Sequence, residues 1–308
     1  MFRLSVHYKK LLKLNYHGKV IKNQRLKEFT TFKLGGNASL YLEICTLENF
    51  IKVMMYIEKF NLPYFVFGNG SKLLVADNGF DGIVIKLKGD FARINIHDEF
   101  IECGAGVCLG ALYQTAKNLS LSGLEESVGI PATIGGATYM NAQAYNFEMA
   151  KIVDYVVAYV DKKITYFTQE QCEFSYRSSV FQKNKAIILR VGIKLSYLDK
   201  DLIQSKYEEV LSFRKQSQPL NLPSAGSVFK RVNGMTISKM LDDAGFKGKK
   251  VNGAEVSTKH ANFIVNNGAT SLDVYTLIEE IKKEFFEIYK INLDNEIIYV
   301  GEFDEINK

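Results

Sequence analysis

The sequence contains few of the residues that build metal sites and disulfide frameworks. Its histidines and cysteines are His7, His17, His97, His260, Cys45, Cys103, Cys108 and Cys172. No two cysteines have Cys-x-x-Cys spacing, and the histidines are far apart along the chain. This distribution predicts no metal site. It also predicts four reduced cysteines, as is usual in the cytosol.

Long apolar runs are also missing, since no segment approaches the roughly 20 residues that span a membrane. The segment Met1–Val20 mixes lysines with leucines and lacks a small-residue cleavage site. A short amphipathic helix is therefore expected there rather than a signal peptide. The net charge of +5 comes from scattered lysines, which do not form a nucleic-acid-binding patch. We expect a cytoplasmic monomer without nucleic-acid or membrane partners.

Strand-like runs alternate with helical spacing over the first two-thirds of the chain, which predicts an α+β protein. Strands are expected at 40–44, 64–67, 82–87, 153–160, 164–167 and 187–195, and helices at 47–60, 109–119 and 201–216. A second segment is expected to begin with Ile101-Glu-Cys-Gly-Ala-Gly106. The charged helix at 201–216 has few apolar residues and is expected to connect two domains. The predicted division is an N-terminal lead-in (1–24), two α/β subdomains (25–90 and 91–198) and a third α/β domain (199–308).

The last third of the chain is expected to contain helices at 236–244 and 271–289 and strands at 263–265 and 297–300. Apolar residues recur at helical spacing in the longer helix, at Leu272, Tyr275, Ile278, Ile281, Phe285 and Ile288. This stripe predicts core packing rather than a cofactor site.

A glycine-rich loop, Gly68-Asn-Gly-Ser-Lys72, directly follows an apolar run. Because glycine has no Cβ, successive backbone N–H groups of such a loop can converge on an anion. The loop lacks the G-x-G-x-x-G dinucleotide fingerprint, and Lys72 stands at the wrong spacing for a P-loop. The residues alone leave two interpretations open, an anion-binding loop and a plain β-turn.

A second segment, 127–144, is rich in small residues: Gly129, Ala132, Gly135, Gly136, Ala137 and Ala142. Its apolar members are too few to make it a packing element. We expect a loop whose backbone lies against a large flat ligand. A tight interdomain loop is the alternative.

These two segments, with Thr31-Phe-Lys-Leu-Gly-Gly-Asn-Ala38 before them, resemble the FAD-binding fold of the vanillyl-alcohol-oxidase and p-cresol-methylhydroxylase superfamily. Further motifs follow in order: Tyr176-Arg-Ser-Ser179, Pro223-Ser-Ala-Gly-Ser-Val-Phe-Lys230, Leu241-Asp-Asp-Ala-Gly245, His260-Ala-Asn-Phe-Ile-Val265 and Asn295-Glu296. Over residues 23–302 the set resembles the UDP-N-acetylmuramate dehydrogenase family, in its shorter variant without a tyrosine-bearing loop insertion.

The resemblance implies a two-part FAD-binding α/β domain followed by a C-terminal α/β substrate domain. It implies an FAD-dependent oxidoreductase of peptidoglycan precursor synthesis, with NADPH as electron donor. The implied reaction reduces UDP-N-acetylglucosamine enolpyruvate to UDP-N-acetylmuramate, with hydride added to the methylene carbon. Negative charge then develops on the α-carbon and its carboxylate, which requires a fixed cation, hydrogen-bond donors and a proton.

Three residues match the catalytic positions of that family. Arg177 would hold the substrate carboxylate with its planar guanidinium, and Ser227 would donate the proton to the α-carbon. Glu296 would stabilise the intermediate together with Arg177, and if protonated it could do so by donating a hydrogen bond. Purely structural roles remain the alternative: a surface arginine beside a turn, a turn serine, and a capping or salt-bridged carboxylate.

The resemblance also assigns residues to non-covalent FAD and to the substrate. The FAD pyrophosphate would lie on Gly68, Asn69, Gly70 and Ser71, and the isoalloxazine and ribityl region on Pro131, Thr133, Ile134, Gly135 and Gly136. Lys230, and with it Arg214 and Lys215, could pair with the substrate diphosphate, and Asn262 matches a substrate-side residue. An exposed helix face is the alternative for Arg214 and Lys215.

Two other functions remain open from the sequence. A flavin oxidase of the same superfamily, acting on an alcohol or sugar, would often attach its flavin through a His or Cys. The glycine-rich segments contain no His, and Cys103 and Cys108 stand in no recognised attachment motif. A non-catalytic nucleotide-sugar binding protein would require Arg177, Ser227 and Glu296 to be dispensable.

Overall fold

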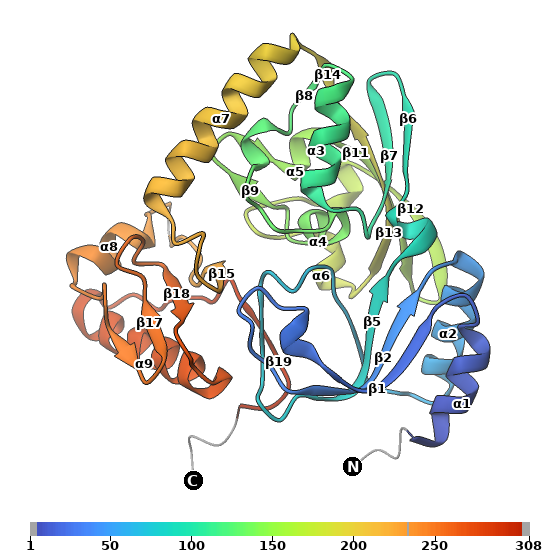
Figure 1. The fold of residues 1–308 in the computed structure, drawn as a ribbon, viewed down its shortest axis with the longest axis horizontal. Coiled ribbons are helices and arrows are strands. Elements are labelled where there is room, and N and C mark those ends of the chain that lie inside the picture. The colour runs from blue at the N-terminus through green and yellow to red at the C-terminus, as the bar shows by residue number, and fades with distance from the viewer. Residues whose placement is uncertain (1–4, 233, 304–308) are drawn as a thin grey trace. The chain divides into compact units, whose positions relative to one another are not determined.

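The computed structural model describes residues 5–232 and 234–303 (Figure 1). The chain forms two compact units. The first unit comprises Met1–Lys22, Leu40–Asn69 and Gly82–Ser212, and the second comprises Asn23–Ser39, Gly70–Asp81 and Phe213–Lys308. Each unit has its own hydrophobic core. The units do not follow the predicted ranges 25–90, 91–198 and 199–308, because residues 23–39 and 70–81 pack with the C-terminal part.

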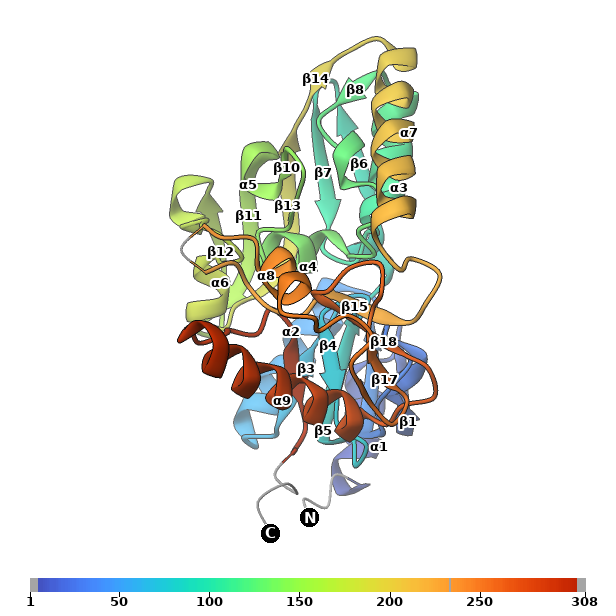
Figure 2. The same ribbon diagram turned by 90° about the vertical axis from the view of Figure 1, so that its left-hand side faces the viewer.

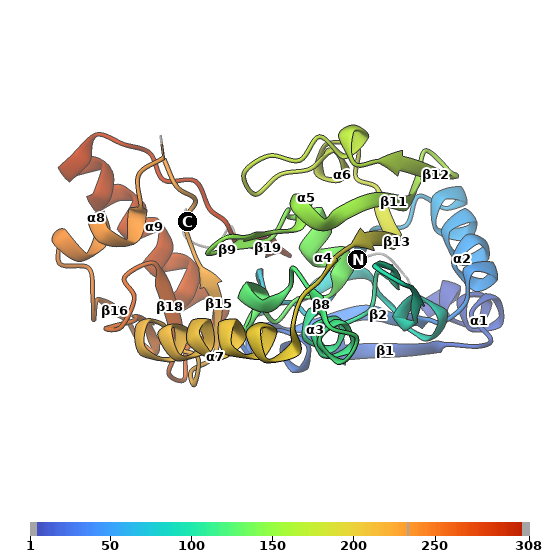
Figure 3. The same ribbon diagram turned by 90° about the horizontal axis from the view of Figure 1, so that it is seen from above.

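A four-stranded sheet, in which β3 and β5 run in parallel, lies mostly in the first unit. Its strands lie in the order β1 (Lys19–Arg25), β2 (Asn37–Ile44), β5 (Phe80–Leu87) and β3 (Tyr64–Val66). Helices α1 (Ser5–Leu14) and α2 (Leu47–Lys59) lie side by side next to it (Figure 1, Figure 3). Phe50 and Met54 of α2 are fully buried, which confirms the helical spacing read from the sequence.

A five-stranded antiparallel sheet forms much of the rest of this unit. Its order is β12 (Lys163–Thr168), β11 (Val153–Val160), β13 (Ile187–Lys194), β7 (Phe100–Gly104) and β6 (Ile94–His97). Helices α3 (Leu109–Asn118) and α7 (Lys200–Ser217) lie side by side (Figure 2). Tyr113 of α3 stacks on Tyr207 of α7, with ring centroids 4.4 Å apart. The strands and helices expected in this region are confirmed. Shorter elements are η2 (Gly89–Ala92), β8 (Leu121–Ser122), η3 (Glu125–Ser127), β9 (Gln143–Ala144), β10 (Phe147–Glu148), α5 (Met149–Ile152), η4 (Glu170–Cys172), α6 (Val180–Lys183) and β14 (Ser196–Tyr197).

The expectation of a continuous loop over 127–144 is wrong, because the segment contains helix α4 (Ile134–Tyr139). Thr133 caps this helix by accepting a hydrogen bond from the N–H of Gly136 at 3.2 Å. A Cβ at Gly135 would lie 2.7 Å from the Cβ of Ala105, so this glycine permits close packing. Adjacent glycines disfavour a helix by propensity, and here the cap and the packing outweigh that preference.

The second unit is built on a four-stranded antiparallel sheet. Its order is β15 (Ser224–Ser227), β18 (Phe263–Asn266), β17 (Ala254–Val256) and β16 (Lys250–Val251). Helix α9 (Ser271–Tyr289) packs against β16 and β17, and this unit also contains α8 (Ile237–Asp243) and η1 (Leu26–Glu28).

The predicted apolar stripe of α9 is only partly correct. Ile278, Ile281 and Phe285 are buried in the core of the second unit, as expected. Ile288, however, is 55% exposed, and Val274 and Leu277 are fully buried instead. Ile288 has the right helical angle, but it lies in the last turn, past the buried part of the helix.

Two short strands explain why residues 70–81 belong to the second unit. β4 (Leu73–Val75) pairs in parallel with β19 (Ile298–Val300). The N–H of Ile298 also donates to the main-chain oxygen of Lys72 at 2.7 Å. Leu74 and Phe32 are fully buried in the same core. The glycine-rich loop therefore runs directly into a strand of the C-terminal part.

Candidate active site

Ser227 and Glu296, two of the predicted catalytic residues, lie on neighbouring main-chain segments of the second unit. Ser227 ends β15, and the next residue, Val228, accepts a hydrogen bond from the N–H of Glu296 at 2.7 Å. Phe229 and Asn295 form an isolated β-bridge beside them. Glu296 is only 3% exposed. The structure therefore brings a serine and a buried carboxylate to the same place.

Lys72 completes this group, although no sequence pattern indicated a role for it there. Its Nζ lies 2.7 Å from Oε1 of Glu296 and donates to the main-chain oxygen of Ser227 at 2.9 Å. The side chain of Lys72 is 27% exposed and that of Glu296 3% exposed, so the ion pair is largely buried. The only sign of this role in the sequence is that Lys72 directly follows the Gly68–Ser71 loop. That position does not indicate that its partner is Glu296, 224 positions further along the chain.

Asn262, predicted to face the substrate, uses its side chain on the main chain of Phe229. Its Oδ1 accepts from the N–H of Phe229 and its Nδ2 donates to the oxygen of the same residue, each at 2.9 Å. The N–H of Val228 donates to the main-chain oxygen of Asn262. These contacts hold the segment that directly follows Ser227.

The predicted diphosphate-binding cations have different surroundings. Lys230 is half-buried, and its N–H donates to the main-chain oxygen of Asp294 at 2.9 Å. Lys215 is exposed, as the helix-face alternative expected. Arg214 is only 8% exposed, so that alternative is wrong for Arg214. The helix has few apolar residues, so its sequence does not show which of its faces is buried.

Arg177 lies in the first unit, at the tip of a tight turn. Ser175 and Ser178 exchange two main-chain hydrogen bonds of 3.1 Å, and they enclose Tyr176 and Arg177. Arg177 has a φ of 54°, an uncommon value for a residue with a Cβ. Its Nη1 donates to the main-chain oxygen of Gln143 at 3.1 Å, and its guanidinium lies 5.5 Å from the ring centroid of Tyr176.

The end of the small-residue segment supports this turn. Oγ of Ser179 and Nε2 of Gln182 both donate to the main-chain oxygen of Tyr139, at 2.7 and 2.8 Å. The amide of Asn141, which is fully buried, donates to the oxygen of Ser175 at 3.0 Å. The segment 127–144 therefore positions Arg177, a role beyond the ligand contact expected from its composition.

The two predicted FAD segments touch each other in the first unit. A Cβ at Gly68 would lie 2.3 Å from Oγ1 of Thr133, so only glycine fits beside this threonine. Thr133 also forms an isolated β-bridge with Cys108, whose Sγ accepts a hydrogen bond from the amide of Asn69. Gly68 and Asn69 thus lie beside the segment that contains Pro131, Thr133, Ile134, Gly135 and Gly136.

Gly70 and Ser71 belong to the second unit, where Gly70 contacts the third FAD-type motif. The N–H of Thr31 donates to the oxygen of Gly70 at 3.3 Å. Gly70 has a φ of 60°, and a Cβ there would lie 2.4 Å from the oxygen of Phe29. This turn requires glycine for its backbone conformation.

Within the small-residue segment 127–144, Gly136 has no explanation in protein packing. The nearest atom to a Cβ built on Gly136 is Oγ1 of Thr133 at 3.4 Å, an ordinary contact distance. The N–H groups of Ile134 and Gly135 are already bound to Val107 and Ala105. The half-buried Gly136 therefore fits a site where a flat ligand such as a flavin lies against the backbone.

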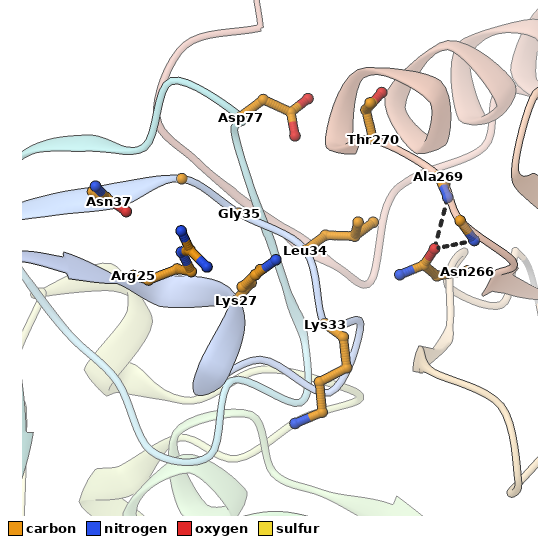
Figure 4. A pocket seen from close by; sticks show the side chains of 12 residues that line it. Arg25, Lys27, Lys33, Leu34, Gly35, Asn37, Asp77, Asn266, Ala269 and Thr270 are labelled. Carbon is orange, nitrogen blue, oxygen red and sulfur yellow. Dashed lines mark hydrogen bonds between the residues drawn. The ribbon is translucent and has the colours of Figure 1, made fainter.

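A separate pocket of about 470 Å³ lies in the second unit, and Arg25, Lys27 and Lys33 line it (Figure 4). The side chains of Asn266 and Asp77, two residues that line it, accept hydrogen bonds from main-chain N–H groups. Oδ1 of Asn266 accepts from the N–H groups at 268 and 269, and the Asp77 carboxylate accepts from those at 271 and 272 in the first turn of α9. Of the residues that the structure describes, none predicted as catalytic lines this pocket.

Over residues 5–232 and 234–303, no helix is long and apolar enough to cross a membrane. Within the same ranges, His, Cys, Asp and Glu side chains form no group of three or more that could hold a metal ion.

Comparison with known proteins assigns both parts of the chain. A family model described as "UDP-N-acetylenolpyruvoylglucosamine reductase, C-terminal domain" matches residues 218–300. A second model, described as "FAD binding domain", matches residues 38–160. These matches confirm the expected fold class, an FAD-binding domain followed by a C-terminal substrate domain.

Curated relatives match nearly the whole chain. The UDP-N-acetylenolpyruvoylglucosamine reductase of Anoxybacillus flavithermus is 39% identical, with 92% of this chain and 95% of the relative covered. That of Bacillus subtilis is 36% identical, with the same coverage. The crystal structure of the Thermus caldophilus enzyme superposes with a TM-score of 0.79 at 34% identity, covering 92% of this chain and 99% of that one. The chain is therefore an FAD-dependent oxidoreductase and belongs to the family of the UDP-N-acetylenolpyruvoylglucosamine reductases.

Proposed function

We propose that this enzyme reduces UDP-N-acetylglucosamine enolpyruvate to UDP-N-acetylmuramate, with NADPH as reductant and non-covalently bound FAD. It acts as a cytoplasmic monomer in peptidoglycan precursor synthesis, on which cell shape and cell division depend. The observation that carries the proposal is the adjacency of Ser227 and the buried Glu296. These two residues match catalytic positions in a chain that is related to such reductases over 92% of its length.

Bound FAD, once reduced, supplies the hydride that the methylene carbon of the substrate accepts. Arg177 binds the substrate carboxylate, because its planar fork matches two carboxylate oxygens and stays charged at any working pH. The turn holds this arginine in place before substrate arrives, and so does the amide of Gln182, which donates to the main-chain oxygen of Arg177 at 3.0 Å. Positioning in advance reduces the entropic cost of reaching the transition state.

Ser227 donates the proton that the α-carbon takes up. A serine hydroxyl is a weak acid, but an enolate is basic enough to accept its proton. Asn262 fixes the main chain that follows Ser227, which limits the positions that Oγ can take. Glu296, on the neighbouring segment, acts on the intermediate together with Arg177.

The remaining assignments concern binding. Gly68, Asn69, Gly70 and Ser71 would hold the FAD pyrophosphate, and the segment from Pro131 to Gly136 would hold the isoalloxazine and ribityl region. Lys230 and Arg214 pair with the substrate diphosphate, since two cations offset its charge. Asn262 remains a candidate substrate residue only if its amide leaves Phe229.

An anaerobic absorption experiment tests this function. The purified protein is expected to be yellow, to bleach with NADPH and to recolour when the enolpyruvyl substrate is added. Acid precipitation should release all the yellow colour, which separates this enzyme from an oxidase with covalent flavin. A colourless protein that cannot be reconstituted with FAD would refute the proposal.

A further inference from the structure

Lys72 links the two predicted catalytic residues of the second unit. Its Nζ contacts the Glu296 carboxylate at 2.7 Å and the main-chain oxygen of Ser227 at 2.9 Å. We propose that Lys72 is a positioning residue of the proton-transfer site: its ammonium keeps Glu296 a carboxylate and fixes the strand end that presents Ser227. This inference rests on the function proposed above, because that function makes Ser227 the proton donor.

The burial of Glu296 explains why the carboxylate needs a cation. With 3% of its surface exposed, Glu296 has little access to water. Glutamates are almost never buried to this degree without a partner, since an isolated buried charge is strongly disfavoured. The neighbouring segments also carry Lys230 and Asp294, whose main chains bond to each other at 2.9 Å.

Lys72 is held at both ends, so its ammonium is already in position. Its main-chain oxygen accepts from Ile298 at 2.7 Å, next to the pairing of β4 with β19. Around the ammonium, Gly226 leaves the necessary space: a Cβ there would lie 3.3 Å from Nζ. The same glycine has a φ of 71°, which a larger residue rarely adopts.

The ion pair has a consequence for the reaction. Negative charge develops on the α-carbon of the substrate, and a lone buried carboxylate near it would oppose that charge. Paired with Lys72, Glu296 adds no net charge to the site. Glu296 is then an ionised hydrogen-bond acceptor that Lys72 links to the main chain of Ser227, and the alternative in which a protonated Glu296 donates to the intermediate does not apply.

The test compares variants of the FAD-loaded full-length enzyme in each half-reaction. Lys72→Met removes the charge, Lys72→Arg keeps it, and Lys72→Gln keeps a hydrogen-bond donor in case the methionine variant does not fold. Stopped-flow absorbance should show reoxidation by the enolpyruvyl substrate slowed about 10²-fold in Lys72→Met, as expected for a displaced catalytic group. Lys72→Arg should recover most of this rate, and reduction by NADPH should change little in all variants.

Isotope-edited infrared spectroscopy gives a readout that does not depend on turnover. In Lys72→Met or Lys72→Gln at neutral pH, Glu296 should show the band of a carboxylic acid. Adding Glu296→Gln to either of these variants should remove that band. Lys250→Met is the matched control, because Lys250 pairs with Glu255 at 3.1 Å in the same unit. This control should leave both half-reactions unchanged.

The outcomes separate the two hypotheses. If the neutral Lys72 variants reoxidise at the wild-type rate, or if Glu296 stays a carboxylate in them, the positioning role is wrong. If they lose FAD affinity while Glu296 stays ionised, Lys72 is a flavin contact instead. If wild-type enzyme is not reoxidised by the enolpyruvyl substrate, the proposed function fails, and the infrared bands still decide whether Lys72 controls the charge of Glu296.

Discussion

The side-chain amide of Asn262 binds both the N–H and the oxygen of Phe229, each at 2.9 Å. Both residues are buried, so neither main-chain group can turn to water if the amide is lost. Phe229 lies two residues after Ser227, at the point where the chain leaves β15. A residue that resembles a substrate contact in the sequence therefore stabilises the backbone of the site.

Asn262→Ala should destabilise the protein more than it weakens substrate binding. Two buried main-chain groups lose their partner, which costs about 1–3 kcal/mol for each unsatisfied group. Urea unfolding measures this loss, and Asn267→Ala is the control because that asparagine is exposed and bonds a surface glutamate. A variant of normal stability with a large rise in KM would instead support direct substrate contact.

Ser227→Ala should separate proton transfer from flavin reduction. The variant loses the proton donor but keeps Arg177 and Glu296, so overall turnover should fall by about 10²–10⁴, the usual contribution of a positioned acid. Reduction by NADPH does not use this proton and should keep its rate. Stopped-flow absorbance of each half-reaction measures both effects. Unchanged reoxidation by substrate would show that another group, such as a water held by Glu296, donates the proton.

Arg177→Lys should slow reoxidation by substrate although the positive charge is retained. A lysine ammonium cannot reproduce the two-point contact of a guanidinium with a carboxylate. The expected loss is about 10²-fold, similar to removing one fixed donor to a developing anion. Arg190→Lys is a suitable control, since Arg190 is exposed and pairs with Glu102. Equal losses in the two variants would contradict the assignment of Arg177.

His260 should make the protein less stable in mild acid. Burial lowers the pKa of His260 below its ordinary value of 6.5, so below that pH the unfolded chain binds a proton more readily than the folded chain. The contribution of the neutral His260 to the free energy of unfolding is fully present above pH 6.5. It is lost as the pH falls toward the lowered pKa of the folded state.

Urea unfolding of wild type and His260→Gln at about pH 8 and about pH 5.5 checks the effect of His260. The variant should lose less stability on acidification than wild type. His97→Gln, a change at an exposed histidine, should behave like wild type. An equal loss in wild type and His260→Gln would show that other groups cause the acid sensitivity.

Local patterns were sufficient for most elements of the fold. The spacing of apolar residues predicted α2, α3, α9 and three strands of the five-stranded sheet, β11, β12 and β13, because it depends only on the helical and strand periods. The motifs around Arg177, Ser227 and Glu296 indicated the family, which the comparisons confirmed. The sequence did not predict α4, since its glycines have low helix propensity and its cap is a single threonine.

Tertiary structure decided the surroundings of each site residue. Nothing in local spacing pairs Lys72 with Glu296, or places the amide of Asn262 on Phe229 and that of Asn141 on Ser175. The same holds for the pairing of β4 with β19, which assigns residues 70–81 to the C-terminal unit. Residue types and intervals specify helices and strands, whereas a contact between segments that are distant in the sequence forms only when the packed core brings the two segments together.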